Sequence, residues 1–358
     1  MDRYCKLGPG KTSPGVFQFE MLIEDKVYSY GFALSYLDGT IIEEWLYQLK
    51  ANGDEKNLFS RNEETVSSDL NLIGKAKTRF GIYAEDIKSQ PRDLFLSELA
   101  KKTDDDAFHI FGDVYHWFAN IIVIFPSSVY MPLPLAIRND DMRNEFEKFL
   151  VHFDTGIDSI EVESSTLKKE LSHYSDEELS DLEEFISQTS AEHEEFGIRG
   201  SDMLLAFRRE NDDLVVEKLK TKHQDAVELF DLKDESDGTK RLFDLVPLLF
   251  EELDNRVVFI DEIDRSMHPK LTVELVKLFY DFTEKKQMQM IATTHESALL
   301  DLSLLRRDEI WFVERQAQGS QLYSLDDFKV RYDKQIEGDY LLGRFGATPL
   351  FPALDSEY

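Results

Sequence analysis

The feature that most constrains the fold is an alternation of helical and apolar strand patterns in the second half of the chain. Helical periodicity at 239–253 and 269–285 separates short apolar runs at 257–260, 288–293 and 309–314. These runs are largely continuous, as in strands that are buried on both faces. We therefore predict an α/β fold with a buried parallel sheet in this region.

Two carboxylates, Asp261 and Glu262, directly follow the first apolar run. Open α/β sheets bind ligands at the carboxyl ends of their strands, where these side chains would emerge. In nucleotide hydrolases the first such acid holds Mg²⁺, which needs hard oxygen ligands, and the second accepts a proton from the attacking water or orients it. This assigns Asp261 to magnesium and Glu262 to general-base catalysis. The alternative is a strand that ends in an ordinary polar turn.

His295 closes the sequence Thr293-Thr294-His295 at the end of the next apolar run. A histidine at that position can hydrogen-bond a terminal phosphate and the attacking water. A lone histidine is usually a structural residue, but this one follows the neighbouring strand, one helix after the acids. We therefore expect His295 to be catalytic together with Glu262.

A third polar segment opens the helix that precedes the acidic strand, and it contains Ser236, Gly238 and Thr239. Free backbone N–H groups and the positive end of the helix dipole suit a phosphate at such a helix start. By itself the segment is better explained as an ordinary N-cap formed by Ser236 or Asp237. The order of the elements along the chain favours the phosphate interpretation: the loop and its helix come first, then the acidic strand, and then the strand that ends in TTH.

The rest of the chain separates into strand and helix patterns. Alternating apolar residues at 16–50 predict a three-stranded antiparallel meander. Helical spacing follows from 86 to 195, and strands return at 202–222. We predict an antiparallel β subdomain at 1–85, an acidic helical insertion at 86–200 and an α/β half at 201–358.

Composition excludes several classes of protein. The 358 residues carry 41 basic and 71 acidic side chains and a formal net charge of -30. This charge argues against nucleic-acid binding by the surface as a whole, but it does not exclude binding by a local basic strip. No apolar run is long enough to span a membrane, and the first fifteen residues lack the pattern of a secretory signal. The single cysteine, Cys5, fits a reducing compartment, so we expect a cytoplasmic protein.

Most of the chain resembles the ABC-like AAA family ATPases of bacteria and archaea, which are distant relatives of the OLD and SMC ATPases. ESDGT at 235–239 resembles their signature loop, and VVFIDEID at 257–264 resembles their Walker B strand. IDRSMHP at 263–269 is similar to the D-loop region, and TTHES at 293–297 to the switch-histidine loop. The tail at 336–349 and the YSYGF, EEWLYQL and LFSR segments also resemble the family.

The resemblance implies an ABC-type P-loop NTPase sheet, of which 201–358 is the second half, and a homodimer that sandwiches ATP and Mg²⁺. Ser236, Gly238 and Thr239 would close on the ATP that the partner chain holds, and Asp264 would lie near the dimer axis. The AAA+ class is a rival, because it also has a DEID strand. It would show an Asn or Thr sensor on the next strand and a C-terminal helical lid, so the TTHE and ESDGT segments favour the ABC class.

The family's phosphate-binding loop, GxxxxGK[ST], has one near match in the segment from Gly8 to Ser13, with Cys5 where the first glycine should be. Few residues precede it, and an alternating strand pattern follows Pro14-Gly15 where a helix is required. We interpret the match as accidental. The chain is then either truncated at its N-terminus or a natural degenerate form, and in both cases we predict weak or no ATP binding by the chain alone.

Three functions compete. In the first, ATP closes a dimeric switch and hydrolysis opens it; relatives of this kind often act in bacterial defence against phage beside a separately encoded effector. The second is a non-hydrolysing interaction scaffold of the same fold. The third, a DNA-repair ATPase of the SMC type, would need a basic tract or long heptad arms, and the insertion is acidic and too short.

Overall fold

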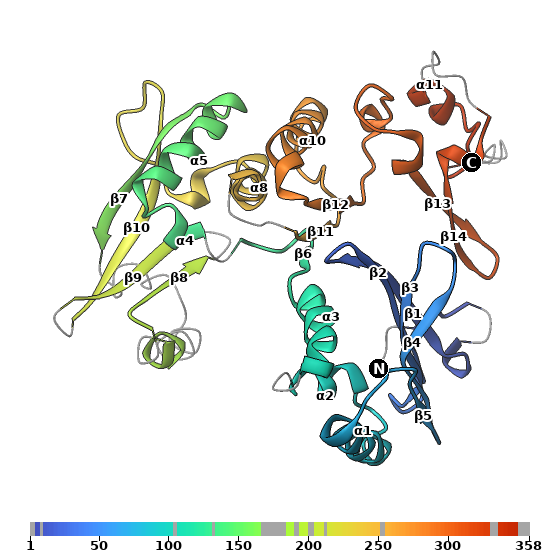
Figure 1. Ribbon diagram of the computed structural model, residues 1–358. Helices are drawn as coiled ribbons and strands as arrows, with labels where there is room; N and C mark the ends of the chain where they lie inside the picture. Colours follow the sequence, from blue (N-terminus) through green and yellow to red (C-terminus); the bar gives the residue numbers. More distant parts are fainter. Residues whose placement is uncertain are drawn as a thin grey trace. The chain divides into compact units, whose positions relative to one another are not determined.

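The computed structural model divides into two compact units (Figure 1). Unit 1 comprises Met1–Ile121, Arg307–Val330 and Gly343–Tyr358, and unit 2 comprises Ile122–Arg306 and Arg331–Leu342. The structure describes residues 4–7, 10–102, 106–130, 133–165, 184–189, 193–199, 204–210, 213–250, 255–329 and 336–349. The parts of the predicted elements at 166–183, 202–203 and 251–253 lie outside the described residues.

Unit 1 is built on a five-stranded antiparallel sheet whose strands follow one another in chain order. They are β1 (Gly15–Ile23), β2 (Lys26–Leu34), β3 (Ile41–Leu49), β4 (Glu55–Asn62) and β5 (Val66–Ser67). The first hairpin turns at Glu24 and Asp25, whose positive φ values of 47° and 61° are those of a two-residue type I′ turn. The meander predicted at 16–50 is confirmed, and β4 and β5 extend it.

Three helices pack their apolar sides against this sheet: α1 (Gly74–Asp86), α2 (Phe95–Ala100) and α3 (His109–Ala119). The core between them is largely aromatic. The ring of Phe59 on β4 lies 5.2 Å from that of Phe95 and 5.9 Å from that of Phe111. Aromatic pairs at such separations add to the free energy gained from burying their surface.

A buried carboxylate fastens α2 to the sheet. Glu44 on β3 accepts hydrogen bonds from the backbone N–H groups of Phe95 and Leu96, at 2.7 and 2.9 Å. It also accepts from Tyr30 Oη at 3.0 Å and from Arg61 Nε at 2.8 Å. Burial raises the pKa of Glu44, and the Arg61 charge and the N–H donors oppose that rise. The first turn of α2 is therefore held by a side chain rather than by packing alone.

The strand predicted at 309–314 is β13 (Trp311–Gln316), and the prediction that it extends the parallel sheet is wrong. It pairs antiparallel with β14 (Gly319–Ser324), and this hairpin belongs to unit 1. Phe312 is buried, whereas Trp311 and Val313 on either side of it are exposed. This alternation is typical of a hairpin strand with one buried face, which a short apolar run does not reveal.

Unit 2 contains the parallel sheet, in the order β12 (Gln289–Ala292), β11 (Val257–Ile260) and β6 (Ile122–Ile124). All neighbours are parallel, and α10 (Pro269–Thr283) connects β11 to β12. Val258 and Ile260 point into the core beneath α8 (Asp237–Leu245), α9 (Pro247–Phe250) and α10. The predicted parallel arrangement of β11 and β12 is confirmed.

A second sheet in unit 2, here called the lobe sheet, has the order β7 (Ile157–Ser165), β10 (Asp213–His223), β9 (Leu204–Glu210) and β8 (Glu195–Arg199). Its strands are antiparallel. The helices α4 (Leu133–Ala136) and α5 (Asp140–His152) pack beside it (Figure 1). The helical pattern predicted for 86–195 is therefore only partly correct, because β6, β7 and the first residue of β8 lie within it.

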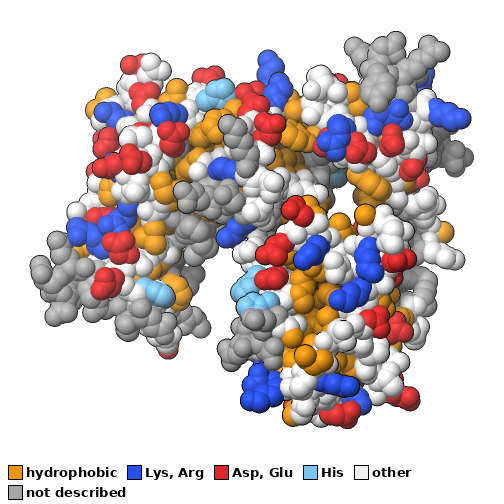
Figure 2. Space-filling model, viewed as in Figure 1, with side chains coloured by type: hydrophobic (Ala, Val, Ile, Leu, Met, Phe, Trp, Pro, Cys, Tyr) orange, Lys and Arg blue, Asp and Glu red, His pale blue; other side chains and the backbone are white. Residues whose placement is uncertain are grey.

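Acidic and basic side chains are interspersed on the face that Figure 2 shows. Among the described residues, no helix has the length and apolar character needed to cross a membrane.

Candidate functional site

Backbone hydrogen bonds hold the turn after β11 to β6 on one side and to the residue after β12 on the other. The N–H of Asp261 donates to the carbonyl of Ile124 on β6 at 2.8 Å. On the other side, the N–H of Ile263 donates to the carbonyl of Thr293 at 3.0 Å, directly after β12. Glu262 lies between these bonds with a φ of 49°, a left-handed backbone conformation that residues other than glycine rarely adopt. Such a conformation persists only where the surrounding structure holds it.

The hydroxyl of Thr293 links Asp261, the predicted magnesium ligand, to Glu262, the predicted general base. It donates to Asp261 Oδ1 at 2.6 Å and accepts from the backbone N–H of Glu262 at 2.9 Å. The Asp261 side chain remains exposed. The hydroxyl therefore orients one carboxylate and fixes the backbone of the next residue with a single group.

Asp264 and His295 are also brought together, through the backbone of His295. Asp264 Oδ1 accepts from Thr294 Oγ1 at 2.6 Å and from the N–H of His295 at 3.3 Å. The side chain of His295 is exposed. The turn at 261–267 and the TTH segment thus form one hydrogen-bonded edge, called here the acidic edge.

The segment with the predicted signature residues caps α8. Ser236 is the N-cap, and its side chain accepts from the N–H of Thr239 at 3.1 Å, while the two hydroxyls lie 2.9 Å apart. The N-cap that the sequence predicts is therefore present. A Cβ added to Gly238 would lie 2.7 Å from the carbonyl oxygen of Ser266. Gly238 thus allows the start of α8 to pack directly against the acidic edge.

Arg241 on α8 is a residue of this site that the sequence did not reveal. It is 5% exposed, and its guanidinium donates to the carbonyls of Phe125, Asp261 and Glu262 at 3.3, 3.2 and 3.4 Å. Burial lowers the pKa of Arg241, and the nearby Asp244 opposes that shift. A single arginine in an amphipathic helix looks like a surface residue in sequence, so only the fold shows its position beside the acidic edge.

The chemistry of the acidic edge fits Mg²⁺ bound together with a nucleotide. Among the described residues, no group of three or more His, Cys, Asp or Glu side chains could hold a metal by itself. Mg²⁺ usually takes one or two carboxylates and completes its shell with water and substrate phosphates. The exposed carboxylate of Asp261 and the neighbouring Thr293 hydroxyl supply oxygen ligands of that kind.

The near match to a phosphate-binding loop lies in unit 1, and, as the sequence predicts, a strand follows it instead of a helix. Gly10–Thr12 form a single 3₁₀ turn, and β1 begins at Gly15 where a helix would be required. The Nζ of Lys11 lies 5.0 Å from the centroid of the Tyr4 ring. Gly8 and Pro9 lie outside the described residues.

Comparison with known families identifies the class of this domain. A family model described as "AAA domain, putative AbiEii toxin, Type IV TA system" matches residues 7–301, which include α8, the acidic strand and the TTH segment. The chain belongs to this family. Membership of this AAA family indicates nucleotide binding and an ATPase-like function in general. A search of curated proteins finds no match to the chain.

Proposed function

We propose that the chain contributes the acidic edge and the signature loop to an ATP-hydrolysing site of the ABC type, which forms between two copies of the protein. The observation that carries this proposal is the Thr293 hydroxyl, which binds both the Asp261 carboxylate and the Glu262 backbone. Strands that merely end in a polar turn need no such link. Here it links two consecutive acids at the carboxyl end of β11 to the residue that follows the neighbouring parallel strand β12.

In this proposal Asp261, Glu262 and His295 have separate roles in hydrolysis. Asp261 holds Mg²⁺, which neutralises phosphate charge when it is bound. Glu262 accepts a proton from the water that attacks the terminal phosphorus, as the bond to ADP breaks. His295 hydrogen-bonds the terminal phosphate, and the hydrogen bond from its N–H to Asp264 fixes the backbone that carries it.

The signature loop acts on the nucleotide of the partner copy. Ser236, Gly238 and Thr239 lie at the N-terminal end of α8, where backbone N–H groups and the helix dipole favour a phosphate. Asp264 lies near the dimer axis and couples the two sites. Because the family description names a toxin–antitoxin system, we propose a separately encoded partner protein, with a role in defence against phage.

A second candidate function is a non-hydrolysing scaffold. The observation in its favour is the 3₁₀ turn at Gly10–Thr12, which lacks the following helix that a phosphate-binding loop needs. The retained acidic edge favours the ATPase.

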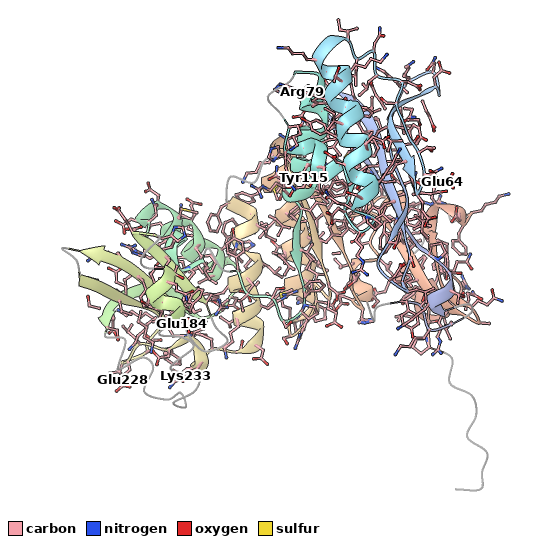
Figure 3. All side chains as sticks on the ribbon, turned by 90° about the horizontal axis from the view of Figure 1, so that it is seen from below. Glu64, Arg79, Tyr115, Glu184, Glu228 and Lys233 are labelled. Atoms are coloured by element: carbon pink, nitrogen blue, oxygen red, sulfur yellow. The ribbon has the colours of Figure 1, made fainter. Side chains whose placement is uncertain are left out.

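ATP turnover tests the proposal. We would assay the chain alone and the protein translated from its full reading frame, each with and without Glu262→Gln. Loss of a general base lowers turnover by about 10²- to 10⁴-fold, so we expect that loss in the variant, with ATP still bound. Glu228→Gln is the matched control, since Glu228 is exposed on the connection between β10 and α8 (Figure 3). Full turnover in Glu262→Gln would contradict the proposal, and an inert protein without further coding sequence would favour the scaffold.

A further inference from the structure

The connection between β10 and α8, residues 224–236, is fastened along β10. Thr221 and Phe230 exchange both backbone hydrogen bonds, at 3.0 and 2.8 Å. The ring of Phe230 lies 4.5 Å from that of His223, and Asp231 Oδ2 lies 3.1 Å from Lys218 Nζ. The connection is therefore bound to the lobe sheet by backbone, ring and charge contacts before it reaches α8.

The last residue before the N-cap of α8 completes this attachment. Glu235 has a side chain that is only 3% exposed, and its Oε1 accepts from the hydroxyl of Thr221. His223 Nε2 lies 2.8 Å from the same oxygen. Burying a carboxylate is costly unless it is paired, so these two partners from β10 hold Glu235 in place. One carboxylate thus joins the lobe sheet to the residue next to Ser236.

The loop that follows is confined on its other side by the acidic edge. Gly238 packs so closely against the carbonyl oxygen of Ser266 that a Cβ would lie 2.7 Å from it. Further along α8, Asp244 accepts from Arg199 of β8 at 3.2 Å. A movement of β10 relative to the acidic edge would therefore act on residues 236–239, because β10 holds Glu235 at one end of the loop while Gly238 lies against Ser266.

We infer that Glu235 is a positioning residue for the loop 236–239, through which the lobe sheet sets the place of the nucleotide-contacting groups. This inference rests on the proposed function, since the loop's position matters to turnover only if the loop closes on a nucleotide. It assigns a role to the lobe sheet: a molecule that binds the sheet and moves β10 changes ATP turnover through the contacts of Glu235 with Thr221 and His223.

Hydrogen exchange in the nucleotide-free protein tests the attachment itself. Thr221→Val removes the hydroxyl donor at nearly constant shape, and Thr221→Ser restores it. Loss of one hydrogen bond to a charged group corresponds to about ten-fold faster exchange. We expect this change in Thr221→Val at the amides of Thr239 and Lys240, which donate to Ser236. Exchange in α10 should stay unchanged, and Thr221→Ser should behave like the wild type. No change in the loop, or an equal change in α10, would overturn the inference.

Turnover by the protein translated from its full reading frame tests the consequence. We expect Thr221→Val to lower kcat by about ten-fold and to leave KM for ATP within about two-fold, because the loop acts on nucleotide that is already bound. If Thr221→Val shows faster exchange in the loop but keeps the kcat of the wild type, the inference is overturned. A wild type without any turnover would count against the proposed function, whereas the exchange result would stand by itself.

Discussion

At the scale of single residues, short hydrogen bonds from hydroxyl groups arrange the candidate site. Thr293 orients Asp261 and Thr294 holds Asp264, each through a hydroxyl 2.6 Å from the carboxylate oxygen. The sequence predicts the acids and His295 as site residues, because they follow apolar strands. It did not assign the two threonines, since a hydroxyl in a polar run carries no signal of its own until the neighbouring strand is in place.

Asp244 yields a prediction about pH. Burial raises the pKa of Asp244 above its ordinary value of 3.8, and Arg199 opposes that rise. The folded state then binds more protons than the unfolded state between the two pKa values, so the free energy of unfolding falls as the pH rises through this window. Asp244→Asn does not titrate. We therefore expect the wild type to lose stability relative to this variant as the pH rises from 3.8.

Urea unfolding, followed by circular dichroism at several pH values, measures this difference. Asp158→Asn changes an exposed carboxylate on β7 and serves as the control. A wild type that gains stability relative to Asp244→Asn with rising pH would show that pairing with Arg199 outweighs burial.

At the scale of elements, prediction from sequence was most accurate where one pattern was continuous. The β11, α10 and β12 elements were predicted because apolar strands and an amphipathic helix alternate there. β6 was missed, because Ile122–Ile124 is too short to show any period. β7 was predicted as helical. Its buried Ile157 and Ile160 are three apart, as in a helix, because the register with β10 shifts between Lys222 and His223.

Gly238→Ala tests the packing of α8 against the acidic edge. The added methyl group would meet the carbonyl oxygen of Ser266 at 2.7 Å, so the backbone must shift. Overpacking of this kind costs about 1–3 kcal/mol, and we expect that loss in the unfolding free energy of unit 2. In the control Gly81→Ala, the methyl group enters open space on α1, and replacing a helical glycine stabilises by up to about 1 kcal/mol. Equal stabilities for the two variants would exclude the close contact.

At the scale of the whole molecule, the acidic edge and the signature loop both belong to unit 2. The signature residues of one copy are proposed to contact the nucleotide of the other, so a single copy cannot complete the site. The inference about Glu235 adds a role in control for the lobe sheet of the same unit. The sequence does not predict this role, because β8 meets α8, and β10 meets Glu235, only in the folded chain.

Sedimentation of the Glu262→Gln protein, translated from its full reading frame, tests whether ATP brings two copies of the chain together. Without hydrolysis the closed state should accumulate, so we expect a monomer without nucleotide and a dimer with ATP and Mg²⁺. Ser236→Arg, which places a bulky side chain at the N-cap of α8, should remain monomeric with ATP. Sedimentation that is the same with and without ATP, or a dimer that Ser236→Arg leaves intact, would contradict a nucleotide site shared between two copies.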